Sequence, residues 1–260
     1  MPTRLNAAES RPAGRVVGMT WDEFLEWLEG HWEPGQHMAI IAPTGEGKTT
    51  FAVPVLNLRQ WVMALDPKGM DDTLSASGFL RVTEMPLPKK LRKQIEEGKP
   101  LRIIIGGSNK TDEEEAQLRG LMQKALKDAR QSGGWTIYAD EFQVLADRRM
   151  YGLDKAVEKM LITARKDRSS VITAFQAFAW VPKAAVRQCR FAVIGPTRDR
   201  NMIKAVAEAM GRDWQELILM LDRLPKWHWI IIPRDVTAPV ILTSPPELTL
   251  STSNKADTGS

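Results

Sequence analysis

Short apolar runs alternate with longer amphipathic stretches along most of this chain. The runs hold four or five residues each, mostly apolar, at 37–41, 61–65, 101–105, 135–139, 171–175, 191–194 and 229–232. Runs of this length, separated by helix-like segments, are typical of parallel strands buried on both faces of a sheet. The pattern predicts an α/β fold with a largely parallel central sheet flanked by helices.

Helical periodicity fills the intervals between these runs. Helices are expected over 49–58, 112–130, 153–164 and 200–210. Another helix is expected to begin after Thr20, because a hydroxyl residue before the acidic pair Asp22 and Glu23 is typical of a helix start. Gly30 is expected to end that helix.

The two ends of the chain lack this pattern. Residues 1–18 and 251–260 are polar and unpatterned, so we expect flexible tails there. The chain has 260 residues and 43% of them are hydrophobic, enough for one substantial core but not for two full domains. The prediction is a single domain over 19–250.

The composition narrows the possible partners and the compartment. The net charge is only +4, so nucleic-acid binding would depend on a local basic surface. Cys189 is the only cysteine, which excludes an internal disulfide and a multi-cysteine zinc site. No stretch approaches the ~18 apolar residues of a membrane-spanning helix, and the start of the chain lacks a signal-peptide core. A cytoplasmic protein without membrane insertion is expected.

The segment Ala42–Thr50 has the features of a phosphate-binding loop. It reads Ala-Pro-Thr-Gly-Glu-Gly-Lys-Thr-Thr and lies between an apolar run and a helix-like run. Glycines allow several backbone N–H groups to converge on phosphates, and the following helix adds the positive end of its dipole. The residues expected to bind nucleotide are Pro43, Thr44, Gly45, Glu46, Gly47, Lys48, Thr49 and Thr50.

Two residues of this loop have specific expected roles. Lys48 should reach the β- and γ-phosphates of ATP, and the Thr49 hydroxyl should ligate Mg²⁺. The strict pattern begins with glycine, where this chain has Ala42. Alanine is small, so this departure is mild.

Asp140 and Glu141 directly follow the apolar run at 135–139, where a buried strand would deliver carboxylates to the carboxyl edge of the sheet. Asp140 is expected to hold Mg²⁺, and Glu141 to polarise the water that attacks the γ-phosphate. The alternative is that both acids merely open a helix. The phosphate loop in the same chain favours the catalytic interpretation, and the water-activating Glu141 favours hydrolysis over kinase activity.

Gln176 ends the apolar run at 171–175, where its amide could contact the γ-phosphate and report its loss. Arg165 lies just before that run. It either completes the active site of a neighbouring subunit or is an ordinary cation near a helix C-terminus, and chemistry alone leaves both open. Arg198 and Arg200 are rival candidates for the same role.

Four sequence blocks together resemble the FtsK–HerA superfamily of ring-forming, DNA-pumping ATPases. They are the phosphate loop, Val62–Gly69 with its Asp-Pro-Lys-Gly end, Ile137–Phe142, and Ala164–Lys166 followed by Val171–Gln176. They occur in the family's order, and the second and fourth are the discriminating ones. Ala164 departs from the glycine of the family pattern.

This resemblance implies a RecA-like domain in a homo-oligomeric, hexameric ring with double-stranded DNA in its channel. It makes Arg165 the leading candidate for the trans arginine, the residue that completes the active site of a neighbouring subunit. It makes Gln176 the leading candidate for the sensor of the γ-phosphate. Coupling proteins and cell-division translocases of the family have membrane segments, which this chain lacks. Viral genome packaging or mobile-element transfer is therefore favoured, with a portal, capsid or transfer-channel protein as a possible partner, in the host cytoplasm or associated with a virion.

Two basic clusters are candidates for contact with DNA phosphates: Lys89–Lys93 and the pair Arg148 and Arg149. A charge cluster is more often a solvated face, so neither identifies the DNA surface alone. The nine tryptophans are interpreted as core, because Trp61, Trp135 and Trp229 belong to strand-like runs.

Other functions compete with a DNA motor. A nucleotide-switched assembly or regulatory ATPase would act on a protein partner without moving DNA, and its hydrolysis would be indifferent to DNA. A terminase-type motor is a third hypothesis, but no clustered acidic nuclease site follows residue 180. A small-molecule kinase is disfavoured by Glu141 and by the lack of an obvious acceptor-binding lid.

Overall fold

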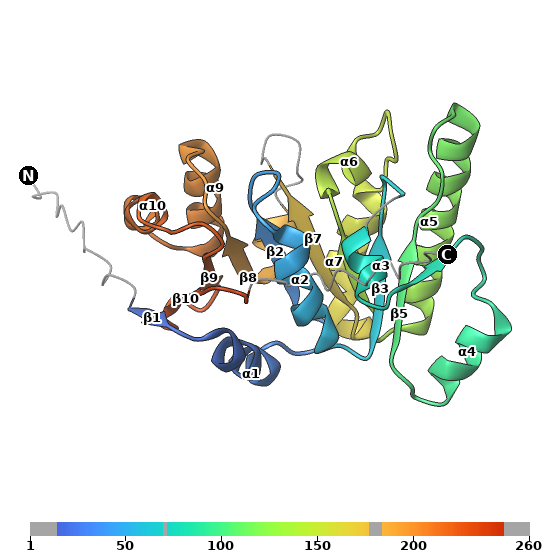
Figure 1. Ribbon diagram of the computed structural model, residues 1–260, viewed down its shortest axis with the longest axis horizontal. Coiled ribbons are helices and arrows are strands. Elements are labelled where there is room, and N and C mark those ends of the chain that lie inside the picture. The colour runs from blue at the N-terminus through green and yellow to red at the C-terminus, as the bar shows by residue number, and fades with distance from the viewer. Residues whose placement is uncertain (1–14, 70–71, 177–183, 247–260) are drawn as a thin grey trace, which may run out of the picture.

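Ten strands form one sheet in the computed structural model, which describes residues 15–69, 72–176 and 184–246. The order across the sheet is β1-β10-β9-β8-β2-β7-β6-β3-β5-β4 (Figure 1). The strands are β1 (Val16–Gly18), β2 (His37–Ile41), β3 (Trp61–Leu65), β4 (Leu80–Val82), β5 (Leu101–Ile105), β6 (Thr136–Ala139), β7 (Ser170–Phe175), β8 (Cys189–Ile194), β9 (Trp229–Pro233) and β10 (Val240–Thr243).

Helices connect most of these strands. They are α1 (Trp21–His31), α2 (Lys48–Asn57), α3 (Asp72–Ala76), α4 (Lys89–Glu96), α5 (Asp112–Ser132), α6 (Phe142–Ala146), α7 (Asp154–Asp167), α8 (Ala184–Arg187), α9 (Arg200–Met210) and α10 (Trp214–Asp222). The predicted α/β class with a mostly parallel sheet is confirmed. Among the described residues, no helix has both the length and the apolarity to cross a bilayer.

One strand differs from the predicted parallel arrangement. The run at 229–232 forms β9, which is antiparallel to both β8 and β10. Two helices, α9 and α10, which pack against each other, separate β8 from β9 and bring the chain back to the edge where β8 ends. Two helices, α6 and α7, also separate β6 from β7, but they carry the chain to the opposite edge and β7 is parallel to β6. A uniformly apolar run is the same in either direction, so the sequence pattern did not reveal the reversal.

Both faces of the sheet are covered, which explains the uniformly apolar runs. On β2, Met38 and Ile40 belong to a cluster with α1 and α2, while Ala39 and Ile41 belong to one with α5, α7, α9 and α10. Successive strand residues point to opposite faces, so a strand with no polar positions needs cover on both. Burying each large aliphatic side chain contributes about 1.5–3 kcal/mol.

The first helix begins as expected and ends later. The Thr20 hydroxyl accepts from Glu23 N (3.3 Å), and the Glu23 carboxylate accepts from Thr20 N (2.8 Å), forming a capping box. The helix passes through Gly30, so the predicted end at Gly30 is wrong. The imidazole of His31 stacks on Trp27, and Trp32 N donates to Leu28 O, which together hold the last turn.

The predicted amino-terminal tail is also too long. Val16–Gly18 pair in parallel with Val240–Leu242 as an edge strand. Three residues carry too little pattern to be recognised as a strand, and their partner lies more than 200 residues away along the chain. The short elements β4, β10, α3, α4, α6, α8 and α10 were likewise not predicted.

Candidate functional site

The loop between β2 and α2 has the backbone conformation that a phosphate-binding loop requires. Gly45 and Gly47 have positive φ angles of 81° and 79°, and α2 begins directly afterwards at Lys48. Glycine reaches this left-handed region without steric cost. The loop therefore places free helix N-terminal N–H groups at the carboxyl edge of the sheet.

The alanine at the first position of the loop has a structural counterpart. Ala42 is fully buried at the end of β2, and Gly195 lies beside it after β8. A Cβ at Gly195 would lie 2.9 Å from the Cβ of Ala42, closer than packed carbons allow. The methyl group that Ala42 has in place of the usual glycine fits because Gly195 beside it has no side chain.

Lys48 points back into its own loop. Its Nζ donates to Ala42 O (2.9 Å) and Pro43 O (3.0 Å), and the residue is only 8% exposed. Desolvation by burial lowers the pKa of Lys48, while the negative charges of Asp140 and Glu141 oppose that shift. No carboxylate of the described residues contacts this buried ammonium directly, so it is poised to bind an anion that enters the loop.

Asp140 and Glu141 follow β6 at the same edge of the sheet. The Tyr138 hydroxyl donates to the Asp140 carboxylate (3.1 Å). Glu141 is the N-cap of α6 and has a φ of 46°, in the left-handed region that non-glycine residues seldom occupy. Strained backbone of this kind clusters at functional sites.

A chain of hydrogen bonds links Glu141 to the phosphate loop. The Thr44 hydroxyl donates to Gln176 Oε1 (2.7 Å), and Gln176 Nε2 donates to Glu141 Oε1 (3.1 Å). Lys68 Nζ donates to the same Glu141 oxygen at 2.5 Å. The pKa of Lys68 is raised, mainly by this hydrogen bond. Three strand ends, after β2, β6 and β7, are thus joined to the turn after β3.

That turn is built around Asp66. Its buried carboxylate accepts from Lys68 N (3.2 Å), Gly69 N (2.9 Å) and the guanidinium of Arg81 (3.3 Å). These bonds set the direction in which the Lys68 side chain leaves the turn. This block was expected only as part of a family resemblance, and Lys68 was not among the predicted site residues. The signal was available, because the Asp-Pro-Lys-Gly turn also ends an apolar run.

These side chains line one cavity of about 440 Å³. Of the predicted site residues, it is lined by Thr44, Gly45, Gly47, Lys48, Thr49, Thr50, Asp140, Glu141 and Gln176. Pro43 and Glu46 belong to the loop but do not line the cavity. The lining residues that sequence reasoning did not assign to the site are Asp66, Lys68, Asp72, Thr73 and Trp227.

Thr49 and Asp140 are suited to a divalent cation. Their hydroxyl and carboxylate oxygens line the same cavity from opposite elements, α2 and the end of β6. Mg²⁺ prefers oxygen ligands, and it usually binds through one or two carboxylates together with substrate phosphates. The donor set therefore fits Mg²⁺ carried in with a nucleotide.

The three candidate arginines lie at different places. Arg165 is in the last turns of α7, close to the amino edge of the sheet, and its side chain lies outside the described residues. Arg198 and Arg200 are exposed after β8, at the same edge as the cavity, but they do not line it. Among the described side chains, neither Arg198 nor Arg200 therefore lines this chain's own cavity.

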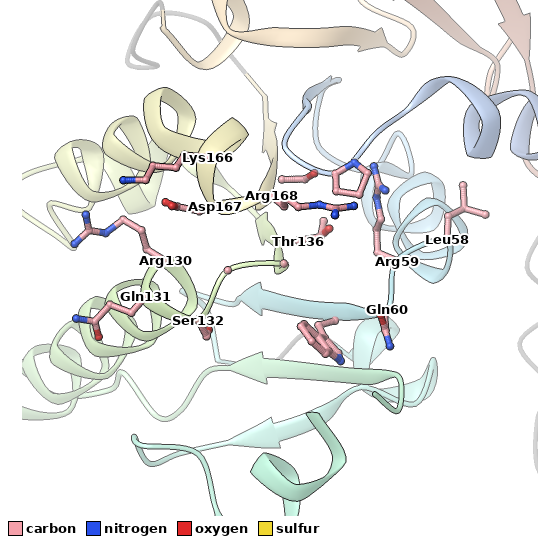
Figure 2. Close-up of a pocket in the computed structure, with 15 residues that line it drawn as sticks. Leu58, Arg59, Gln60, Arg130, Gln131, Ser132, Thr136, Lys166, Asp167 and Arg168 are labelled. Carbon is pink, nitrogen blue, oxygen red and sulfur yellow. The ribbon is translucent and has the colours of Figure 1, made fainter. Parts of the chain in front are cut away.

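A second and larger cavity, of about 750 Å³, lies at the opposite edge of the sheet. Figure 2 shows it where α2, α5 and α7 end, with Arg59 and Arg168 reaching into it and Lys166 and Arg130 further out. Arg59 stacks on Trp32 at 3.7 Å and donates to Trp32 O (2.7 Å), and burial lowers its pKa to about 10. This cavity contains none of the predicted site residues.

No family model and no curated protein matches the sequence. Solved structures match the fold. One is the genome packaging NTPase B204 from Sulfolobus turreted icosahedral virus 2 in complex with AMPPCP, with a TM-score of 0.57 and 14% identity over 82% of this chain and 98% of that chain. Another is VirB4 of Thermoanaerobacter pseudethanolicus, with a TM-score of 0.58 and 11% identity over 83% and 90%.

A third match is the cytoplasmic domain of the Type VII secretion ATPase EccC from Thermomonospora curvata. Its TM-score is 0.57 and its identity 14%, over 86% of this chain and 27% of that one. At such low identities the likeness establishes the fold. The resemblance predicted from four sequence blocks is thus confirmed at the level of the fold, which this chain shares with genome-packaging and secretion ATPases.

Proposed function

We propose that this chain is a RecA-like P-loop ATPase that hydrolyses ATP with Mg²⁺ and moves double-stranded DNA as a homo-oligomeric ring. Viral genome packaging or mobile-element transfer is the proposed process. The observation that carries the proposal is the hydrogen-bonded chain Thr44–Gln176–Glu141–Lys68 facing Lys48 across one cavity. It supports the proposal because the Glu141 carboxylate is joined through Gln176 to Thr44 of the loop.

The roles follow from the contacts. When ATP binds, Lys48 exchanges the carbonyls of Ala42 and Pro43 for phosphate oxygens, and the N–H groups at the start of α2 bind the phosphates. Thr49 and Asp140 would hold Mg²⁺, which neutralises charge on the phosphates. Glu141 polarises the attacking water. Lys68 and Gln176 both donate to Glu141 Oε1 and so orient the carboxylate that polarises this water.

Gln176 is also the proposed sensor. Its side chain accepts a hydrogen bond from Thr44 of the loop and donates one to the Glu141 carboxylate. Loss of a phosphate that contacts Thr44 or Glu141 would therefore disturb the hydrogen bonds of Gln176. The segment that follows it, 177–183, lies outside the described residues.

The helix α4 is the favoured DNA surface. Leu91 and Ile95 pack against the core, which leaves Lys89, Lys90, Arg92 and Lys93 exposed. Figure 1 shows α4 at one end of the molecule, beside the edge of the sheet formed by β4 and β5. The other basic pair has acidic partners, since Arg148 pairs with Asp154 and Arg149 with Asp147. On α4 only Lys93 has an acidic partner among the described ion pairs, Glu97 at 3.6 Å. Backbone phosphates bind unpaired cations best, so Lys89, Lys90 and Arg92 make α4 the better surface.

The test is steady-state ATP hydrolysis with and without long double-stranded DNA at two salt concentrations. We expect severalfold stimulation by DNA that weakens with salt, and a loss of about 100-fold or more in Glu141→Gln. Lys90→Glu should reduce the stimulation without changing basal turnover, whereas Lys127→Glu on α5 should change neither. Hydrolysis that is indifferent to DNA would instead favour an assembly or regulatory ATPase acting on a protein partner.

The ring and the trans arginine need a separate test. Arg165→Ala and Glu141→Gln are each expected to be inactive. When the two are mixed, sites form that combine an intact Glu141 with an intact Arg165 from the neighbour, and part of the activity should return. The same mixing with Arg198→Ala or Arg200→Ala identifies which arginine acts. No recovery with any of the three would contradict a trans arginine.

A further inference from the structure

Trp227 lines a cavity, so the interpretation of the nine tryptophans as core is wrong for this residue. It lies in the turn between α10 and β9, and it lines the same cavity as Lys48 and Glu141. It is 37% exposed, unlike the strand residues Trp135 and Trp229, which are buried. An exposed indole in a polar cavity contributes little to the core, so its position needs another explanation.

The backbone at Trp227 is strained. Its φ angle is 65°, in the left-handed region, where a bulky side chain is a genuine outlier. Two hydrogen bonds hold the turn: His228 N donates to Pro225 O (3.2 Å), and the Ser244 hydroxyl donates to Trp227 O (3.2 Å). Strain that the surrounding structure maintains is concentrated at ligand clamps and active sites.

The indole is seated on the phosphate loop itself. A Cβ placed on Gly47 would lie 2.7 Å from Cζ3 and 3.0 Å from Cε3 of Trp227. Gly47 is therefore needed for the close approach of this ring as well as for its own positive φ. The Trp227 ring is fixed against the start of α2 while part of it stays open to the cavity.

The order of the strands places Trp227 on a particular side of the loop. β2 lies between β7 and β8. Glu141 and Gln176 follow β6 and β7 on one flank. Trp227 precedes β9, which is antiparallel to β8, so it reaches the same edge on the other flank. A nucleotide whose γ-phosphate lies toward Glu141 must extend its nucleoside toward β8 and β9.

We propose that Trp227 is the stacking platform for the purine base of the bound nucleotide. The proposal rests on the proposed ATPase function and adds a base site to its phosphate site. Lys226 Nζ lies 5.0 Å from the centroid of the ring, and this exposed cation would be displaced by the base. Stacking uses the π-face that every base has, so adenine and guanine nucleotides should bind comparably.

The experiment compares the binding of AMPPCP and of inorganic tripolyphosphate by calorimetry. Trp227→Ala should weaken AMPPCP about 5- to 100-fold and leave tripolyphosphate unchanged, because only the former has a base to stack. Trp227→Phe should keep most of the affinity. The matched control is Trp214→Ala, since Trp214 is also 36% exposed and lies near a lysine, Lys204, but does not line the cavity.

A second measurement uses the unaltered chain. AMPPCP should change the tryptophan fluorescence and tripolyphosphate should not, and Trp227→Phe should remove the change. If Trp227→Ala weakens both ligands equally, Trp227 only supports the loop and the base-site proposal is wrong. It is also wrong if AMPPCP binding is unaffected. If the unaltered chain binds neither ligand, the ATPase proposal itself fails.

Discussion

The two edges of the sheet both carry a polar cavity with basic side chains, yet only one has the features of a phosphate site. The cavity at the amino edge is the larger, about 750 Å³ against 440 Å³, and it gathers Arg59, Arg130, Lys166 and Arg168. The cavity at the carboxyl edge has two lysines, Lys48 and Lys68, and several acids. Cavity volume and the number of basic side chains would therefore point to the amino edge as the phosphate site, although the phosphate-loop features lie at the carboxyl edge.

The difference lies in which helix ends meet at each edge. At the carboxyl edge α2 begins, and its free N–H groups favour an anion. At the amino edge α2, α5 and α7 end, and their free carbonyls favour cations. Arg59 is an example at this edge, because it donates to the carbonyl of Trp32, the residue that caps α1. Backbone polarity, more than side-chain charge, distinguishes the two edges.

The largest expected effect compares one lysine from each edge. Lys48→Ala should weaken AMPPCP binding by about 30-fold to 1,000-fold or more, because it removes a buried charged donor to the phosphates. Lys166→Ala at the amino edge should leave binding within about twofold. Calorimetric titration measures both. Equal losses would show that the amino-edge cavity takes part in nucleotide binding.

The next effect is on stability. Arg59→Ala should lower the free energy of unfolding by about 1–3 kcal/mol, since it removes the stack on Trp32 and leaves the carbonyl of Trp32 without its donor. Chemical denaturation measures the change, and nucleotide affinity should not move. Arg59→Lys is the control: it keeps the charge but not the planar stack, and should recover only part of the loss.

A smaller effect is the pH dependence of binding. Burial lowers the pKa of Lys48 in the free chain, and bound phosphates would raise it again. Affinity should therefore fall as pH rises through the lowered pKa, below the usual lysine value of about 10.4, and binding there should take up a proton. Titrations in buffers of different ionisation enthalpy measure the uptake. It should persist in Lys68→Ala, because the pKa of Lys68 is already raised.

The smallest effect concerns Lys68. Its ion pair with Glu141 is partly exposed, with 66% of the lysine side chain open to solvent. Exposed pairs contribute roughly 0–1 kcal/mol, so Lys68→Ala should change turnover by no more than about fivefold. Hydrolysis assays with Lys166→Ala as the matched lysine measure this. A loss as large as that of Glu141→Gln would mean that Lys68 itself contacts the reacting phosphate.

The sequence alone determined the longer helices, the apolar strands of the sheet centre and the chemistry near their ends. A phosphate loop, an acidic pair and an apolar run ending in Gln176 are local patterns, each delivered by one strand end. Parallel strands bring their carboxyl ends to one edge, so it followed that these residues would meet. The uniformly apolar runs likewise predicted a sheet covered on both faces, because every strand position had to be buried.

Tertiary structure alone decided what depends on strand order and on direction across the sheet. The strand β9 is antiparallel to β8, and that reversal brings Trp227 to the carboxyl edge beside Gly47. The bond from Lys68 to Glu141 joins residues 73 positions apart. No local sequence pattern encodes a contact of this kind, because it exists only where the strand order makes β3 and β6 neighbours in the sheet.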